Sequence, residues 1–124
     1  MIVIGRRGGE DYEQGLFDGK WLTPRDSRRQ GGYHDGRLFW IPGPWHVDCC
    51  AAWEFDGQCV RPINAFAMPW QFDGQLLRPD WDSAMKSWQF DGRLLKPCDS
   101  AKDDEWEATA AVPLPVIMRC AGLI

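Results

Sequence analysis

The chain has 124 residues, 44% of them hydrophobic and 26% charged, with a formal net charge of −4. This length indicates one domain, residues 1–124, and the composition excludes a disordered chain. No dominant excess of Lys and Arg could neutralise a phosphate backbone, so we expect no nucleic-acid partner.

The first residues, "MIVIG", form an apolar stretch too short for a secretion signal, and the positive charges follow it rather than precede it. No apolar run approaches the ~18 residues of a membrane span, so we expect no membrane partner. Five Cys, an odd number, indicate thiols rather than a disulfide framework. Together these features predict a cytoplasmic protein.

One ten-residue unit recurs along the chain. It is clearest in "WQFDGQLLRP" (70–79) and "WQFDGRLLKP" (88–97). A degenerate sixth copy, "WEATAAVPLP" (106–115), lacks the Asp-Gly pair. The six copies start near residues 15, 32, 53, 70, 88 and 106. The Asp-Gly pairs are Asp18-Gly19, Asp35-Gly36, Asp56-Gly57, Asp73-Gly74 and Asp91-Gly92. Repeats of this length predict a quasi-regular stack or ring.

Each copy is expected to form a tight β-hairpin, because Asp-Gly between apolar residues favours a type I′ turn. In the fourth copy this turn sets Phe72 opposite Gln75 and Trp70 opposite Leu77. Trp70, Phe72 and Leu77 then share the core face. Leu76 points to the second face, which we expect a neighbouring hairpin to cover.

The expected fold is all-β, with six hairpins of about 17–21 residues in a closed, barrel-like ring. A hairpin solenoid and a β-trefoil are the alternatives. Closure is preferred because both apolar ends, "MIVIG" and "VIMRCAGLI", look strand-like, and strand edges without a pairing partner promote aggregation.

The W-x-F-D-G-x-x-L-x-P unit resembles repeats in small uncharacterised bacterial proteins, several of them carried on integron gene cassettes. This resemblance covers most of the chain and implies a tandem hairpin fold, but no activity or catalytic residue. The repeats also resemble, more loosely, those of bacterial cell-wall-binding modules, which bind choline or glycan in aromatic pockets between hairpins.

Eight Trp are present, and large aromatics are first of all core residues. Trp45 and Trp81 lie outside the repeat frame, and Trp40 lies in the irregular second copy. These three are the candidate ligand-binding residues, since an exposed Trp ring can hold a sugar or another apolar ring.

A reactive cluster interrupts the repeat at "GPWHVDCC" (43–50), which holds His46, Cys49 and Cys50. Thiol and imidazole groups together could hold a metal or activate a Cys, but no second ligand pair follows at a zinc spacing. We therefore expect no metal, no cofactor and no catalytic residue. An enzyme with a site near His46 and Cys49 is the least favoured interpretation.

Equivalent repeats favour binding over catalysis, because catalysis needs one asymmetric constellation. The leading hypothesis is a non-catalytic β-repeat binding module that uses aromatic side chains. Its partner would be a small molecule, a glycan or a protein. The alternative hypothesis is a structural, self-associating protein that forms a homo-oligomer.

Overall fold

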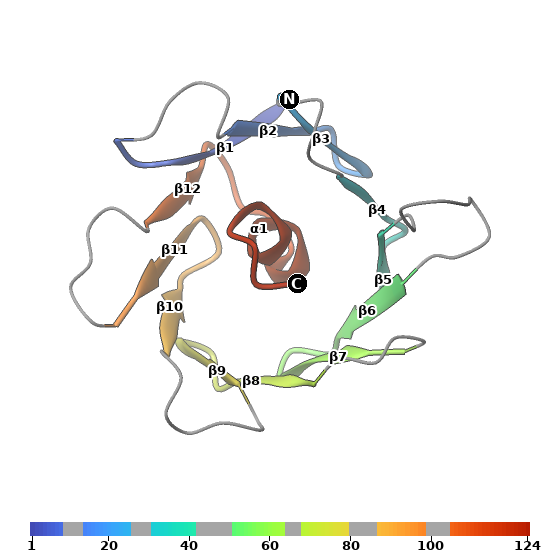
Figure 1. Ribbon diagram of the computed structural model, residues 1–124, viewed down its shortest axis with the longest axis vertical. Coiled ribbons are helices and arrows are strands. Elements are labelled where there is room, and N and C mark those ends of the chain that lie inside the picture. Colours follow the sequence, from blue (N-terminus) through green and yellow to red (C-terminus); the bar gives the residue numbers. More distant parts are fainter. Residues whose placement is uncertain (9–13, 26–30, 42–50, 64–67, 80–86, 99–104) are drawn as a thin grey trace.

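The computed structural model describes residues 1–8, 14–25, 31–41, 51–63, 68–79, 87–98 and 105–124. Within this part of the chain, twelve antiparallel strands close into one barrel around a short helix (Figure 1). The predicted closed ring of hairpins is confirmed. The solenoid and the trefoil are wrong, because every described strand is paired on both sides within a single sheet.

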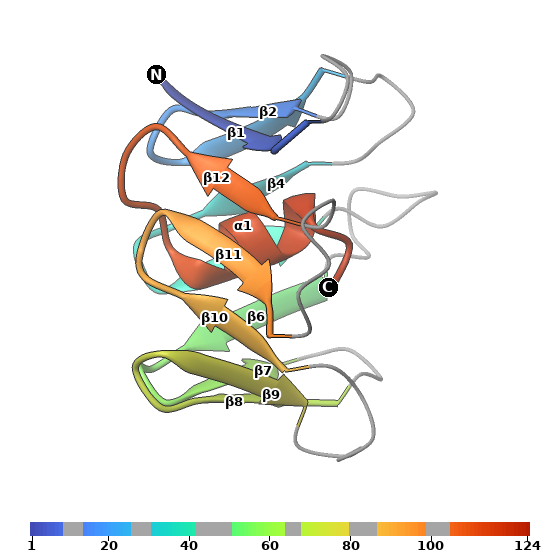
Figure 2. The ribbon, with the colours of Figure 1, turned by 90° about the vertical axis from the view of Figure 1, so that its left-hand side faces the viewer.

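The strands follow each other around the barrel in chain order, two for each of the first five copies, with β1 before them and β12 from the sixth copy. They are β1 (Ile2–Arg6), β2 (Gln14–Phe17), β3 (Trp21–Pro24), β4 (Gly32–His34), β5 (Leu38–Ile41), β6 (Ala51–Phe55), β7 (Cys59–Pro62), β8 (Trp70–Phe72), β9 (Leu76–Pro79), β10 (Trp88–Phe90), β11 (Leu94–Pro97) and β12 (Trp106–Ala108). The helix is α1 (Leu114–Cys120). Figure 2 shows the β8–β9 and β10–β11 turns at the same end of the barrel.

The inner face of the barrel carries the first, third and eighth residues of the first five copies. In the fourth copy these are Trp70, Phe72 and Leu77, as predicted, and Trp70 and Leu77 are buried. The first-position tryptophans of the last four copies, Trp53, Trp70, Trp88 and Trp106, are all buried in this core. Burying such a ring removes ~150–250 Å² from water, a gross gain of about 4–6 kcal/mol. These rings are core residues, as expected.

The turns differ from the prediction in register. Phe72 pairs with Leu77 rather than with Gln75, and Trp70 pairs with Pro79. The two loop residues are therefore Gly74 and Gln75, and Gly74 has a φ of 105°, which favours glycine. Because the register differs by two residues, each side chain keeps its predicted face.

A carboxylate caps each of these turns. Oδ1 of Asp73 accepts hydrogen bonds from the backbone amides of Gln75 at 2.9 Å and Leu76 at 2.8 Å. The same pair of bonds recurs at Asp18, Asp35, Asp56 and Asp91. The Asp of the repeat therefore precedes the loop and fixes it, whereas a type I′ turn would place Asp inside the loop.

The ring closes between the N-terminal strand and the sixth copy. β1 pairs with β12 on one side, with Ile4 opposite Ala108, and with β2 on the other, with Ile4 opposite Gly15. β1 thus replaces the second strand of the sixth hairpin. Ile4 has the place that Leu77 has in the fourth copy, and both side chains are fully buried.

The C-terminal apolar segment is a helix, and the expectation of a strand there is wrong. An eight-stranded barrel is already wide enough for side chains to fill, so twelve strands leave a wider lumen that needs further contents. Helix α1 fills this lumen, and its side chains from Leu114 to Met118 are all buried. Pro115 lies in the first turn, where a proline costs no hydrogen bond. No helix among the described residues is long and apolar enough to cross a membrane.

Candidate functional site

The outer face of the barrel carries the second, seventh and ninth residues of the first five copies. We expected a neighbouring hairpin to cover it, and that expectation is wrong. Neighbouring hairpins lie side by side in one sheet instead of stacking. Trp21, at the seventh position, is 56% exposed, and Leu76 and Leu94 at the same position are half-buried. The ring therefore has an outer belt of side chains that reach the solvent.

Neighbouring hairpins meet in one repeated register. The seventh residue of one copy lies opposite the second residue of the next, as in the pairs Trp21–Tyr33, Leu38–Glu54, Cys59–Gln71 and Leu76–Gln89. Within each hairpin the second residue pairs with the ninth, as Gln71 does with Arg78. We call the sixth residue of one copy, with the second and ninth of the next, a groove set.

Four consecutive groove sets differ sharply in chemistry. In chain order they are Lys20, Tyr33 and Trp40; Arg37, Glu54 and Arg61; Gln58, Gln71 and Arg78; and Gln75, Gln89 and Lys96. The same backbone frame thus presents an aromatic, an ionic and two amide-rich surfaces side by side on the belt.

Two residues of the first groove set, Tyr33 and Trp40, form with Trp21 a group that we call the aromatic cluster. These residues are consecutive cross-strand neighbours: Trp21 pairs with Tyr33, and Tyr33 pairs with Trp40. The ring centroids of Trp21 and Tyr33 are 4.6 Å apart at an interplanar angle of 48°. Three aromatic side chains therefore lie in a row across β3, β4 and β5, with Trp21 the most exposed.

Asp35 holds the Trp40 ring in place. The indole Nε1 of Trp40 donates a hydrogen bond to Oδ2 of Asp35 at 3.1 Å, while Oδ1 caps the turn. The amide of Leu38 and the indole of Trp40 lower the pKa of Asp35 from 3.8 to about 2. The carboxylate is therefore ionised at neutral pH, and its bond to the indole fixes one end of the cluster.

The second groove set is an ionic clamp, formed by Arg37, Glu54 and Arg61. Nε of Arg37 donates to Oε2 of Glu54 at 2.9 Å, and Nε of Arg61 donates to Oε1 at 3.1 Å. The Glu54 side chain is only 10% exposed between the two guanidinium groups. Their hydrogen bonds, first that of Arg61 and then that of Arg37, lower the pKa of Glu54. This groove therefore holds one carboxylate between two cations.

The third groove set lines a hollow that we call hollow A, between the β6–β7 and β8–β9 hairpins. Its volume is about 500 Å³. Its walls are Gly57, Gln58, Gln71, Phe72, Asp73, Gly74, Leu76 and Arg78. Two amides, a carboxylate and a guanidinium thus face a leucine and the edge of the aromatic core.

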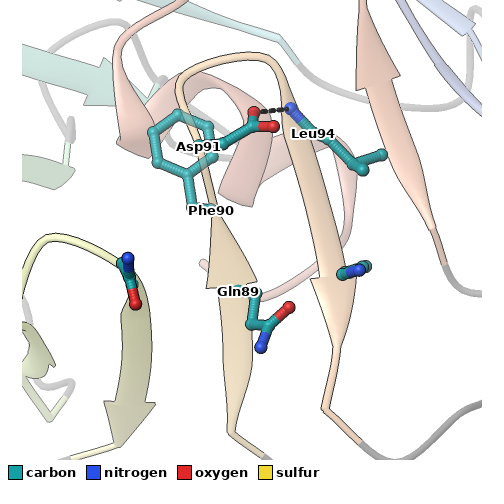
Figure 3. Close-up of a pocket in the computed structure, with 6 residues that line it drawn as sticks. Gln89, Phe90, Asp91 and Leu94 are labelled. Carbon is teal, nitrogen blue, oxygen red and sulfur yellow. Dashed lines mark hydrogen bonds between the residues drawn. The ribbon is translucent and has the colours of Figure 1, made fainter.

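The fourth groove set lines hollow B, one hairpin further along (Figure 3). Its volume is about 320 Å³. It is lined by Gln75, Gln89, Phe90, Asp91, Leu94 and Lys96, each at a repeat position that also lines hollow A. Figure 3 shows the Asp91 carboxylate held by the amide of Leu94 at the turn. The two hollows are therefore formed by equivalent residues of successive repeats.

Of the three Trp proposed from the sequence, Trp40 lies in the aromatic cluster, whereas Trp45 and Trp81 lie outside the described residues. Sequence reasoning missed Trp21 and Tyr33. Trp21 stands at a repeat position shared with Cys59 and Leu76, so it was assigned to a covered face. Only the register between hairpins brings the three aromatic residues together.

The reactive cluster of His46, Cys49 and Cys50 also lies outside the described residues. In the part of the chain that is described, no group of three or more His, Cys, Asp or Glu could hold a metal ion. His34 has a turn role instead: its Nδ1 accepts a hydrogen bond from the amide of Gly36 at 3.2 Å, and burial lowers its pKa.

Comparison with known proteins gives no match. No family model, curated protein or solved structure is similar to this chain at a significant level. The chemistry of the outer belt is therefore the basis for a functional proposal.

Proposed function

We propose that this barrel is a non-catalytic binding module that holds a sugar ring on the aromatic cluster. The observation that carries this proposal is the exposed indole of Trp21 beside Tyr33 and Trp40 on a fixed sheet surface. The C–H groups on one face of a pyranose form a flat apolar surface. An exposed aromatic ring covers such a surface with little loss of conformational entropy, because its side chain has only two rotatable bonds.

The surroundings of the cluster support a sugar over a purely apolar ligand. Lys20 is exposed in the same groove set, and the Asp35 carboxylate bonds the Trp40 indole. Charged and polar groups beside an aromatic surface can bond the hydroxyl groups at the rim of a sugar ring. The negative net charge of the protein disfavours nucleic acid as a partner, since a phosphate backbone requires a dominant positive patch.

The test is a titration of the purified protein with neutral oligosaccharides, namely cellohexaose, chitohexaose and maltohexaose, by calorimetry. Trp21→Ala should weaken binding at least about tenfold, because exposed tryptophans are typical binding hot spots. Met68→Ala is the matched control: Met68 is another large exposed apolar residue, 52% exposed, outside the cluster. Equal effects of the two substitutions would contradict the proposal.

Self-association is the second candidate function, and the same observation favours it. An exposed Trp on the outer face of the barrel can pack against the same face of a second copy. Light scattering over a range of protein concentrations distinguishes the candidates. A dimer that Trp21→Ala converts to a monomer supports self-association, and a monomer at every concentration excludes it.

A further inference from the structure

We propose that hollows A and B each bind the carboxylate of an acidic sugar unit, so that together they hold two uronate residues of one oligosaccharide. This inference rests on the proposed sugar-binding function and adds a second region of the belt, separate from the aromatic cluster. It follows from comparing the two hollows with the ionic clamp.

The clamp shows which chemical group this type of groove can hold. There the second position of the groove set is Glu54, whose carboxylate bonds Arg61 at the ninth position. Both hollows have glutamine at the second position and keep the cation at the ninth. The glutamine side chain has the same length as glutamate but no charge. The protein thus fills one groove with its own carboxylate and omits that carboxylate from the next two.

The cations in the hollows lack the ion-pair partner that the clamp provides. Within the described residues, Arg61 pairs with Glu54, whereas no carboxylate forms an ion pair with Arg78 or Lys96. A carboxylate entering either hollow would meet this cation with a glutamine amide beside it. A charge-assisted hydrogen bond to a guanidinium or ammonium group is stronger than one between neutral groups.

Each hollow also contains a protein carboxylate, Asp73 in hollow A and Asp91 in hollow B. In both, Oδ1 accepts two backbone amide bonds, which lower the pKa and offset part of the negative charge. The other oxygen is a potential acceptor for a sugar hydroxyl. The acid group of the ligand belongs at the cation, on the ninth position, away from the turn.

The rest of the wall favours a sugar unit over an extended acidic peptide. Volumes of about 320 and 500 Å³ lie in the usual range of small-molecule pockets. Leu76 in hollow A and Leu94 in hollow B, at the outward-facing seventh position, give each hollow an apolar side chain for the C–H face of a ring. The strands around them are paired on both sides, so an extended peptide finds no strand edge to join.

Repetition of the hollow points to a repeating ligand. Hollows A and B share the β8–β9 hairpin, and they are built from the same repeat positions. Two neighbouring sites of the same chemistry bind two units of one oligomer more tightly than one unit, because the second unit binds at a high effective concentration. The order of preference should therefore be an acidic oligomer, then its monomer, then a neutral oligomer.

The test uses trigalacturonate as the probe, with galacturonate, maltotriose and a poly-glutamate peptide of similar charge for comparison. Gln71→Glu and Gln89→Glu place a protein carboxylate where Glu54 stands in the clamp. Each should weaken trigalacturonate binding about tenfold or more, and the double variant should abolish it. Gln14→Glu, the same charge change on β2 away from both hollows, is the matched control and should have little effect.

Three results would overturn this inference: maltotriose or poly-glutamate binding as tightly as trigalacturonate, unchanged binding in the Gln71→Glu and Gln89→Glu variants, or no binding of trigalacturonate at millimolar concentration. The sugar-binding proposal at the aromatic cluster fails in a different way. There, neutral oligosaccharides would bind wild type and Trp21→Ala equally. Trp21→Ala should leave trigalacturonate binding in the hollows within about twofold of wild type.

Discussion

The backbone amide of Val3 donates a hydrogen bond to Oγ1 of Thr109 at 3.0 Å, across 106 residues of sequence. The amide of Thr109 donates in turn to the carbonyl oxygen of Val3, also at 3.0 Å. In the fourth copy the same two bonds join Leu76 and Asp73 within one turn. Thr109 therefore replaces the repeat aspartate, and the two ends of the barrel complete a sixth hairpin without a loop.

Thr109→Val removes the hydroxyl acceptor and keeps the shape of the side chain. We expect it to lower the free energy of unfolding by about 1 kcal/mol, the usual net value of one hydrogen bond. Urea unfolding followed by tryptophan fluorescence measures the change. Thr23→Val, at an exposed site on β3, is the control and should change stability by less than about 0.5 kcal/mol. Equal effects at both sites would contradict the role of Thr109 in closure.

The lumen helix should be essential for the stability of the barrel. Ile117 on α1 is fully buried, and Ile117→Ala should cost about 2–5 kcal/mol, because it leaves a cavity between the helix and the barrel wall. Ile63→Ala makes the same substitution at a residue that is 52% exposed, and should cost less than about 0.5 kcal/mol. Comparable losses in urea unfolding would show that α1 does not fill the core.

Gly32 leaves space for a larger neighbour. A Cβ atom at Gly32 would lie 2.3 Å from Cζ of Phe39, which occupies the eighth position of the second copy, where the fourth and fifth copies have Leu. Gly32→Ala should therefore cost about 1–3 kcal/mol through overpacking. In the Phe39→Leu background the same substitution should cost less. A double-mutant cycle in urea tests this, and additive effects would contradict the steric coupling.

The turn carboxylates make stability depend on pH. Amide hydrogen bonds lower the pKa of Asp18, Asp35, Asp56, Asp73 and Asp91 in the folded protein below the usual 3.8, to about 2 for Asp35. As the pH falls, the unfolded chain therefore binds protons first. This contribution to stability is complete above the usual pKa and disappears as the pH falls through the lowered values.

Urea midpoints measured from pH 6 to pH 2 should fall steadily below about pH 4. Asp35→Asn removes the turn carboxylate whose pKa falls to about 2 and should make this fall shallower between pH 4 and pH 2. An unchanged slope in the Asp35→Asn variant would show that the Asp35 carboxylate does not contribute to acid sensitivity.

The sequence predicted the closed ring because the repeat is a local signal: Asp-Gly pairs, alternating apolar residues and closing prolines all describe one hairpin at a time. The face to which each side chain points was predicted from the alternation of apolar residues alone. That prediction is correct although the predicted register is wrong, because the two registers differ by two residues. The register itself depends on whether Asp lies inside or before the loop. Asp73 decides this through two side-chain bonds to backbone amides, and the sequence pattern does not distinguish the two positions.

The remaining errors concern long-range packing. "VIMRCAGLI" is an apolar run whose periodicity suits a strand or a buried helix equally well, and the width of a twelve-stranded barrel decides for the helix. The aromatic cluster was only partly predicted for a similar reason. Trp40 stood out as an irregular residue, but its partners Trp21 and Tyr33 become neighbours only when separate hairpins pair.

We propose that Trp21 is part of a ligand-binding surface, and acrylamide quenching of tryptophan fluorescence tests this role most directly. Wild type and Trp21→Phe are compared without ligand and with whichever neutral oligosaccharide binds in calorimetry. We predict that wild type has a strongly quenched fraction which the ligand protects, and that Trp21→Phe loses this protected fraction. Quenching that no oligosaccharide reduces, or ligand protection of undiminished extent in Trp21→Phe, would contradict this role of Trp21.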